Sequence, residues 1–289
     1  MFKNGLKTVV LLAGLAGSFI LLGSLLGGPR GIVIGAVFGF GLVGGSYWFS
    51  DRLAVKSARA VEVAPGELEW LRADLAALAG RAGMATPRLF VSPDAQPNAF
   101  ATGRNERSAI VCVTQGLLAV LDRQEVRGVV AHEVAHVRHR DILIGSIAAA
   151  VATGISMLAN LAMFASMFGG GSDDEDGPNP VAVLVLALVA PIAATVMQMA
   201  LSRSREFEAD RLGAELAGDP RPLASALAKL ERAAQAVPMD VAPAQATAYI
   251  VNPLTGREVR FSNLFLTHPP TEARIAALLA IDPALAGPR

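Results

Sequence analysis

Four long apolar runs constrain the fold of this chain more than any other feature. They cover residues 6–26, 31–49, 142–168 and 180–201, and the last three contain no charged side chain. A helix of about 20 apolar residues crosses the roughly 30 Å hydrocarbon core of a bilayer, so each run is long enough to span a membrane. The order of the runs predicts two transmembrane hairpins, residues 1–50 and 142–201, with an acidic external loop at 169–179.

The first run has one alternative interpretation, a cleaved signal peptide, because Lys3 and Lys7 stand near its start. Its length, the lack of a clear Ala-x-Ala cleavage site and the second run that follows at once argue against cleavage. The short Gly-Gly-Pro-Arg segment between the runs is typical of a turn, and the aromatic end of the second run suits a membrane interface. We therefore expect both runs to stay as a hairpin.

Positive charge predicts the orientation of the chain in the membrane. Basic residues gather on the side that the two termini share with the polar segments 51–141 and 202–289, whereas the opposite loops carry only Arg30 and the acidic run. The basic residues on the shared side are Lys3, Lys7, Arg52, Lys56, Arg59, Arg138, Arg140, Arg203 and Arg205. By the positive-inside rule both termini and both polar segments are cytoplasmic.

The polar composition excludes some function classes. Lys and Arg together number 25, as do Asp and Glu, and no basic patch with interleaved aromatics is present, so a nucleic-acid partner is not expected. The single cysteine, Cys112, lies in an apolar run and is interpreted as a buried strand residue rather than a nucleophile.

The first polar segment contains His132-Glu133-Val-Ala-His136. On a helix, residues four apart share a face about 6 Å apart along the axis, so both imidazoles can reach one zinc ion at about 2.0–2.1 Å. Glu133 lies about 100° round the helix, close enough to reach a water at the metal without ligating it. This spacing is typical of a zinc metalloprotease, with Glu133 as general base.

The periodicity of the polar segments predicts a mainly α protein with a small edge sheet. We expect strands at 87–92 and 109–113, between helices at 67–83 and 114–121, and then the motif helix at 125–139 with Asp122 as its N-cap. In the second polar segment we expect helices at 206–217 and 222–237, a hairpin around 252–256, and a last helix from Thr271.

A catalytic zinc takes three protein ligands, so the motif is incomplete. His139 is rejected because it lies seven residues, about 10 Å, from His132 along the axis. The metzincin pattern also fails, since it needs Gly at the position of His139. Glu206 and Asp210 share one helical face, so one can ligate zinc while the other accepts a hydrogen bond from a ligating imidazole; Glu208 is expected to face solvent.

Several motifs together resemble the HtpX family. They are the His132–His136 motif, Arg203-x-x-Glu206-x-x-x-Asp210 after an apolar run, residues 261–270 with His268-Pro-Pro, and Pro97-Asn98-Ala-Phe-Ala-Thr-Gly103, and the resemblance covers essentially the whole chain. The family consists of bacterial membrane-bound, heat-shock-linked zinc metalloproteases related to the CAAX prenyl endopeptidases. The resemblance implies four transmembrane helices and a cytoplasmic gluzincin-type α+β protease domain at the inner membrane.

The resemblance also implies roles for individual residues. Glu206 is the third ligand of one Zn²⁺ per chain, and Asp210 holds a ligating imidazole. His268 and Arg274 lie near the active site and help to bind the substrate carbonyl or stabilise the oxyanion. Asn98 is on the strand that flanks the cleft and holds the substrate backbone.

The predicted function is hydrolysis of peptide bonds in misfolded or damaged membrane proteins, as part of quality control in the stress response. The alternatives are a CAAX-type prenyl-peptide protease and a non-catalytic, zinc-stabilised membrane scaffold. A site-2 type intramembrane protease needs an aspartate ligand in a later span, and residues 180–201 contain no acid. A scaffold has no need of Glu133, since a structural zinc site requires no general base.

Overall fold

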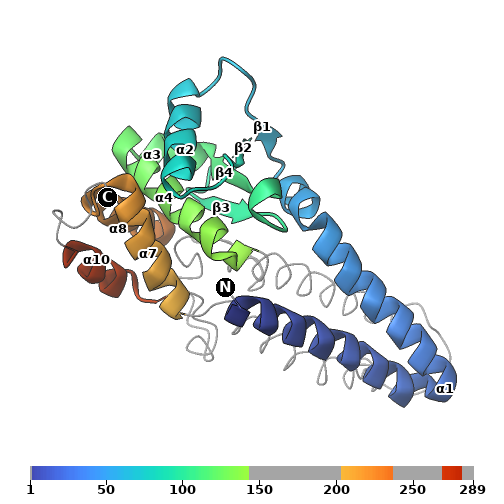
Figure 1. The fold of residues 1–289 in the computed structure, drawn as a ribbon. Coiled ribbons are helices and arrows are strands. Elements are labelled where there is room, and N and C mark those ends of the chain that lie inside the picture. The colour runs from blue at the N-terminus through green and yellow to red at the C-terminus, as the bar shows by residue number, and fades with distance from the viewer. Residues whose placement is uncertain (1, 143–202, 237–268, 282–289) are drawn as a thin grey trace, which may run out of the picture.

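The computed structural model describes residues 2–142, 203–236 and 269–281 (Figure 1). Nearly all of the second expected hairpin, the turn expected at 252–256 and His268 lie outside the described residues. In the part of the chain that is described, none of the helices is long and apolar enough to cross a membrane.

Helix α1 (Phe2–Ser57) reverses direction within the expected turn. Gly28 has φ 56° and ψ −139°, which only glycine adopts readily, and Pro29 follows it. Figure 1 shows the resulting two arms, the first running away from the rest of the molecule and the second returning to it. The arms pack closely, because a β-carbon on Gly35 would collide with the carbonyl of Phe19.

A sheet of four strands lies where α1 meets the rest of the chain. Its order is β1 (Val61–Glu62), β2 (Arg88–Ser92), β4 (Ile110–Thr114) and β3 (Ala99–Thr102). Strands β2 and β4 are parallel, while β1 and β3 pair antiparallel with their neighbours. The periodicity predicted β2 and β4 but not β3, whereas the family resemblance implied a strand at Asn98, which directly precedes β3. As a result β4, the last strand before the motif helix, is internal, and β3 forms the edge.

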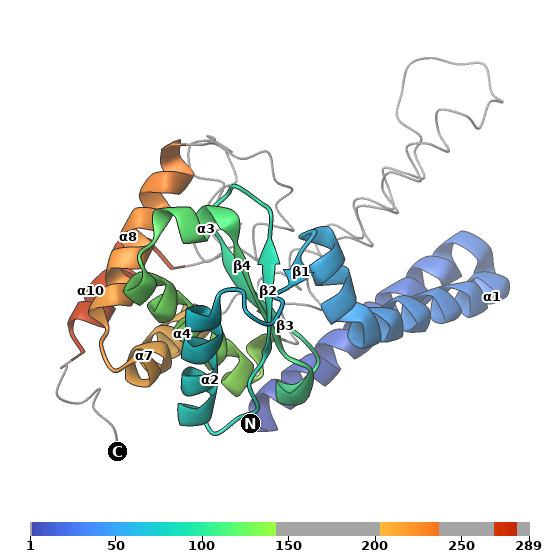
Figure 2. The ribbon, with the colours of Figure 1, turned by 90° about the horizontal axis from the view of Figure 1, so that it is seen from above.

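Helix α4 (Arg123–His139) carries the motif and lies at the centre of the packed domain (Figures 1 and 2). The sheet and α2 (Glu69–Arg81) cover one side of it. The other side packs against α7 (Arg203–Ala217) and α8 (Arg221–Ala236), with α10 (Thr271–Leu279) behind them. Short α3 (Gln115–Val120) links β4 to α4. The apolar residues Val126, Val129, Val130 and Val134 are almost fully buried, as expected of a central helix.

The beginning of α4 is fixed by a capping box, a feature that goes beyond the predicted Asp122 cap. Asp122 accepts a hydrogen bond from the Glu125 amide at 3.0 Å, and Glu125 accepts one from the Asp122 amide at 2.9 Å. Glu125 also accepts hydrogen bonds from Ser225 at 2.6 Å and Lys229 at 2.7 Å, both on α8. The cap of the motif helix is therefore also the point at which α8 is tied to it.

Candidate metal centre

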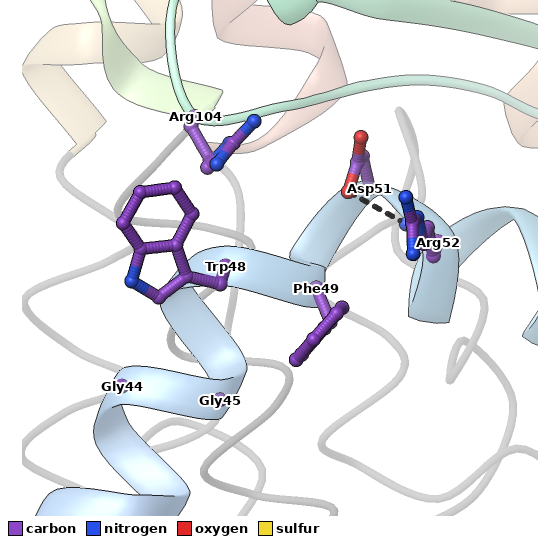
Figure 3. Close-up of a pocket in the computed structure, with 7 residues that line it drawn as sticks. All are labelled: Gly44, Gly45, Trp48, Phe49, Asp51, Arg52 and Arg104. Atoms are coloured by element: carbon purple, nitrogen blue, oxygen red, sulfur yellow. Dashed lines mark hydrogen bonds between the residues drawn. The ribbon is translucent and has the colours of Figure 1, made fainter.

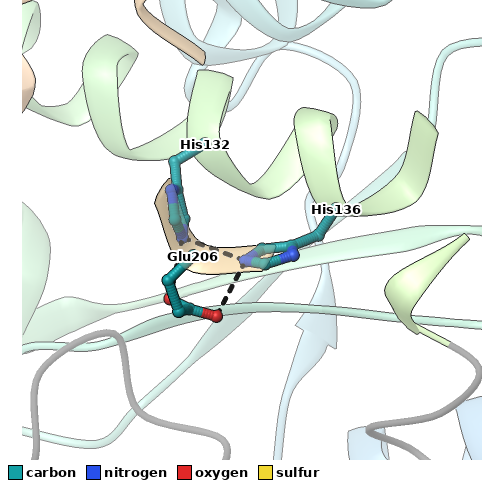
Figure 4. A group of neighbouring side chains, drawn as sticks. All are labelled: His132, His136 and Glu206. Atoms are coloured by element: carbon teal, nitrogen blue, oxygen red, sulfur yellow. Dashed lines mark hydrogen bonds and ion pairs between the residues drawn. The ribbon is translucent and has the colours of Figure 1, made fainter. Parts of the chain in front are cut away.

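Side chains from α4 and α7 meet at one point, although about 70 residues separate them in the chain (Figure 4). His132 and His136 come from α4 and Glu206 comes from the first turn of α7. One ligand atom from each lies within 4.8 Å of the other two. His132 and Glu206 are buried, and His136 is partly exposed.

The spacing of these atoms fits a tetrahedral zinc ion. At bond lengths near 2.1 Å, neighbouring ligands of such an ion are about 3.4 Å apart. The two Nε2 atoms of His132 and His136 are 3.1 Å apart. Glu206 Oε1 lies 3.5 Å from Nε2 of His136, and Oε2 lies 3.8 Å from Nε2 of His132. These three residues are the donor set that zinc prefers in catalytic sites, with a fourth position left for water or substrate.

The opposite side of the His132 ring faces a buried ion pair. Nδ1 of His132 lies 2.9 Å from Oδ1 of Asp210. Asp210 in turn accepts two hydrogen bonds from the Arg274 guanidinium, at 2.7 and 2.8 Å. Burial acts to raise the pKa of Asp210, but Arg274 and His132 outweigh it and lower that pKa to about 2. An ionised Asp210 favours the tautomer of His132 with its proton on Nδ1, which leaves Nε2 free to bind a metal.

His136 has an equivalent partner that sequence reasoning missed. Its Nδ1 lies 3.4 Å from Oδ2 of Asp141, and Arg205 approaches the other oxygen of Asp141 at 3.8 Å. Burial disfavours a charged imidazole, yet Glu206 and Asp141 raise the pKa of His136 to about 9. The carboxylates of Glu206 and Asp141 thus stabilise a positive charge near the rings of His132 and His136. The only sequence signal for Asp141 is its position five residues after His136, just past the end of α4.

Glu133 lies beside His136 and Glu206 but is not part of the group that could hold a metal. It is 5% exposed, and burial together with Glu206 raises its pKa to about 7, against the opposing effect of His136. The backbone amide of Ala101, in the edge strand β3, also acts to lower this pKa. A carboxylate with such a pKa can take up and release a proton near neutral pH, as a general base must.

The other predicted site residues are placed as follows. Glu208 is exposed and faces away from the ligands, and His139 does not belong to the group. Arg274 is buried and lies 3.7 Å from Glu206. It pairs with Asp210, the partner of His132, instead of lining an open surface. Asn98 is buried directly before β3, where its backbone amide donates to the Thr114 hydroxyl at 2.9 Å. The roles of Asn98 and Arg274 toward substrate stay predictions.

Known proteins resemble the chain in both sequence and fold. Residues 65–282 match the model of Peptidase family M48. The chain is 48% identical over 283 residues to a protease HtpX homolog of Methylibium petroleiphilum, which covers 97% of this chain and 98% of that protein. It is also 48% identical over 277 residues to one of Persephonella marina, covering 94% and 96%.

Among solved structures, that of S. mikatae Ste24p has a similar fold, with a TM-score of 0.52 at 19% identity. The likeness covers 96% of this chain and 65% of that one. The M48 match spans strands β2 to β4 and the described helices from α2 onward, including α4 and α7, and the HtpX homologs match nearly end to end. The chain therefore belongs to peptidase family M48 and is a metalloendopeptidase of the HtpX type.

Proposed function

We propose that this metalloendopeptidase is zinc-dependent and membrane-anchored. The observation that carries the proposal is the convergence of His132, His136 and Glu206, with the buried acid Glu133 beside them. Two imidazoles and one carboxylate are the ligand set of catalytic zinc in thermolysin-like enzymes. When bound, zinc supplies Lewis-acid polarisation of the scissile carbonyl and lowers the pKa of water from 15.7 towards about 7.

Glu133 is proposed as the general base and acid of the reaction. Its raised pKa, about 7, suits a group that accepts the proton of the attacking water and later gives it to the leaving amine. Asp210 and Asp141 hold the two imidazoles in the ligating orientation, and Arg274 keeps Asp210 ionised. The predicted contribution of His268 to oxyanion stabilisation falls on a residue outside the described part of the chain.

The edge strand β3 is the proposed substrate platform. An extended peptide can add to a sheet edge through its main chain, and β3 occupies that edge. The amide of Ala101 within β3 favours the ionised form of Glu133, which supports a peptide beside β3 passing close to the proposed base. Asn98 immediately precedes this strand, which supports its proposed role in holding the substrate backbone.

The four apolar runs support a place in the bacterial inner membrane, with the active site and both termini cytoplasmic. This location favours misfolded or damaged membrane proteins as substrates, and membrane protein quality control as the role. A prenylated CAAX peptide is the alternative substrate, and a side-by-side cleavage assay distinguishes the two.

The test is metal analysis combined with casein cleavage by the full-length protein. Wild type should hold one zinc and cleave casein. Glu133→Gln should keep the zinc but lose at least about 100-fold in rate, because it removes proton transfer and no ligand. Glu206→Gln should lose both. Glu208→Gln is the matched control, since this neighbouring acid on α7 is exposed. Wild-type cleavage by Glu133→Gln would reject the mechanism.

A further inference from the structure

A cavity of about 360 Å³ lies where the end of α1 approaches the chain segment after β3, and none of its lining residues is a candidate metal ligand (Figure 3). Its lining consists of Gly44, Gly45, Trp48, Phe49, Asp51, Arg52 and Arg104. The two glycines leave the floor open, because a β-carbon on either would meet nothing within 4 Å. The volume is within the usual range of about 300–1,000 Å³ for small-ligand sites.

Two guanidinium groups border this cavity without a carboxylate partner among the described residues. Arg104 stacks on the Trp48 ring at 4.7 Å, and its buried Nε has no hydrogen-bond partner. Arg52 lies over the Phe49 ring at 5.7 Å. Asp51, the one acid in the lining, accepts a hydrogen bond from the backbone amide of Arg52 at 2.9 Å.

The nearest acid along the chain does not neutralise Arg104 either. Glu106 instead approaches Arg138 at 3.6 Å and Arg140 at 3.8 Å, both at the end of α4. The lining therefore keeps a formal excess of positive charge beside two aromatic rings. Arginine guanidinium groups that hold no carboxylate can bind phosphate oxygens through charge-assisted hydrogen bonds.

The position of the cavity suggests the source of that phosphate. Trp48 and Phe49 end the second apolar run, at the level where aromatic side chains meet the lipid headgroups. Arg52, Lys56 and Arg59 follow on the side that faces the cytoplasm in the proposed topology. Acyl chains beside the apolar arm of α1 would place a headgroup phosphate at the depth of Arg52 and Arg104.

We propose that this cavity binds the phosphate of an anionic phospholipid headgroup. Arg52 and Arg104 supply the positive charge, Trp48 covers one side, and Gly44 and Gly45 make room for the headgroup. The inference rests on the membrane placement proposed above, but it is independent of the metal centre. It adds an anionic phospholipid as a partner of the protein.

The test uses the tryptophan in the cavity as a reporter. The chain has two tryptophans, so Trp70→Phe leaves Trp48 as the only one. The full-length Trp70→Phe protein is reconstituted in vesicles that contain either brominated phosphatidylglycerol or brominated phosphatidylcholine. The ratio of their quenching at equal mole fraction gives the relative association constant. We expect phosphatidylglycerol to be preferred, and Arg104→Gln or Arg52→Gln to reduce the preference about fivefold each.

Arg107→Gln is the matched control. This exposed arginine is three residues from Arg104 but outside the cavity, so its removal should change the preference less than twofold. Equal effects of Arg107→Gln and Arg104→Gln would mean a diffuse surface charge and overturn the site. Equal quenching by both lipids in the reporter protein would overturn it as well.

Two further outcomes separate the related ideas. If neither brominated lipid quenches Trp48, the membrane placement itself is wrong, and with it the lipid site. In a parallel experiment inorganic phosphate is added to the vesicles with phosphatidylglycerol. If the cavity binds lipid, millimolar phosphate should change the preference for phosphatidylglycerol no more than sodium chloride does at the same ionic strength. Saturable loss of the preference would assign the cavity to free phosphate and reject the lipid.

Discussion

Gly213 of α7 packs directly on the backbone of His132 in α4. A β-carbon added to Gly213 would lie 2.9 Å from the amide nitrogen of His132 and 3.0 Å from its Cα, closer than real side chains approach. Gly213 is one turn beyond Asp210 and two turns beyond Glu206. The missing side chain therefore lets α7 come near enough for its two acids to reach the imidazole.

Replacing Gly213 by alanine should push α7 away from α4. Backbone atoms cannot yield as a flexible side chain would, so we expect a loss of about 1–3 kcal/mol in stability. The displacement also separates Glu206 from the histidines. Casein cleavage should fall about 10–100-fold, since small misplacements at a reacting centre are costly. Zinc titration and cleavage rates measure both effects.

Gly80→Ala is the control for this substitution. Gly80 is inside α2, and a β-carbon there would meet nothing within 4 Å. Alanine should stabilise that helix by about 0.5–1 kcal/mol and leave cleavage unchanged. Normal zinc affinity in Gly213→Ala would contradict the packing argument.

Asp141→Asn should weaken zinc binding about 10–100-fold, because it removes the carboxylate 3.4 Å from Nδ1 of His136. Competition with a chelating dye gives the affinity. Asp74→Asn is a suitable comparison: Asp74 is also buried and also pairs with arginines, Arg123 and Arg127, but it is not at the metal centre. It should reduce the melting temperature and spare zinc affinity. Equal zinc affinity in both variants would count against a positioning role for Asp141.

Asp210 should make the stability of the protein depend on acid pH. The pKa of its carboxyl is lowered from 3.8 to about 2 in the folded chain, where burial is outweighed by Arg274. Its stabilising contribution is therefore complete above about pH 4 and is lost as the pH falls towards 2, by about 2 kcal/mol. Thermal unfolding in detergent with a chelator present, between pH 5 and 2.5, measures this slope. Asp210→Asn should lack it, and an unchanged slope in that variant would assign the acid sensitivity to other groups.

Glu125→Gln should destabilise the chain by about 1–2 kcal/mol without changing its zinc content. The substitution removes the charge that Lys229 binds at 2.7 Å and weakens the cap of α4. Glu215→Gln removes an acid of the same type from the exposed Arg211–Glu215 pair, and should change stability by less than about 0.5 kcal/mol. A similar loss of stability in both variants would show that the Glu125–Lys229 pair between α4 and α8 stabilises the chain no more than an exposed pair does.

The sequence by itself determined the local features of this protein. The spacing of His132, Glu133 and His136 places two imidazoles and an acid on a helix, and Asp122 predicts where that helix begins, because both depend on contacts within one or two turns. The same local reasoning found β2, β4 and most helices to within a few residues. The turn at Gly28 follows from glycine and proline in the same way.

Only the tertiary structure decided how distant segments combine. The acids of α7 were visible as candidates, but their approach to His132 depends on the close crossing at Gly213, which no local pattern reveals. Strand β3 is only four residues long, too short for a clear local pattern, so its place at the sheet edge comes from pairing with β4. Asp141 and Arg274 gained their roles in the same way, because burial and ion pairing between elements are set by packing and not by spacing along the chain.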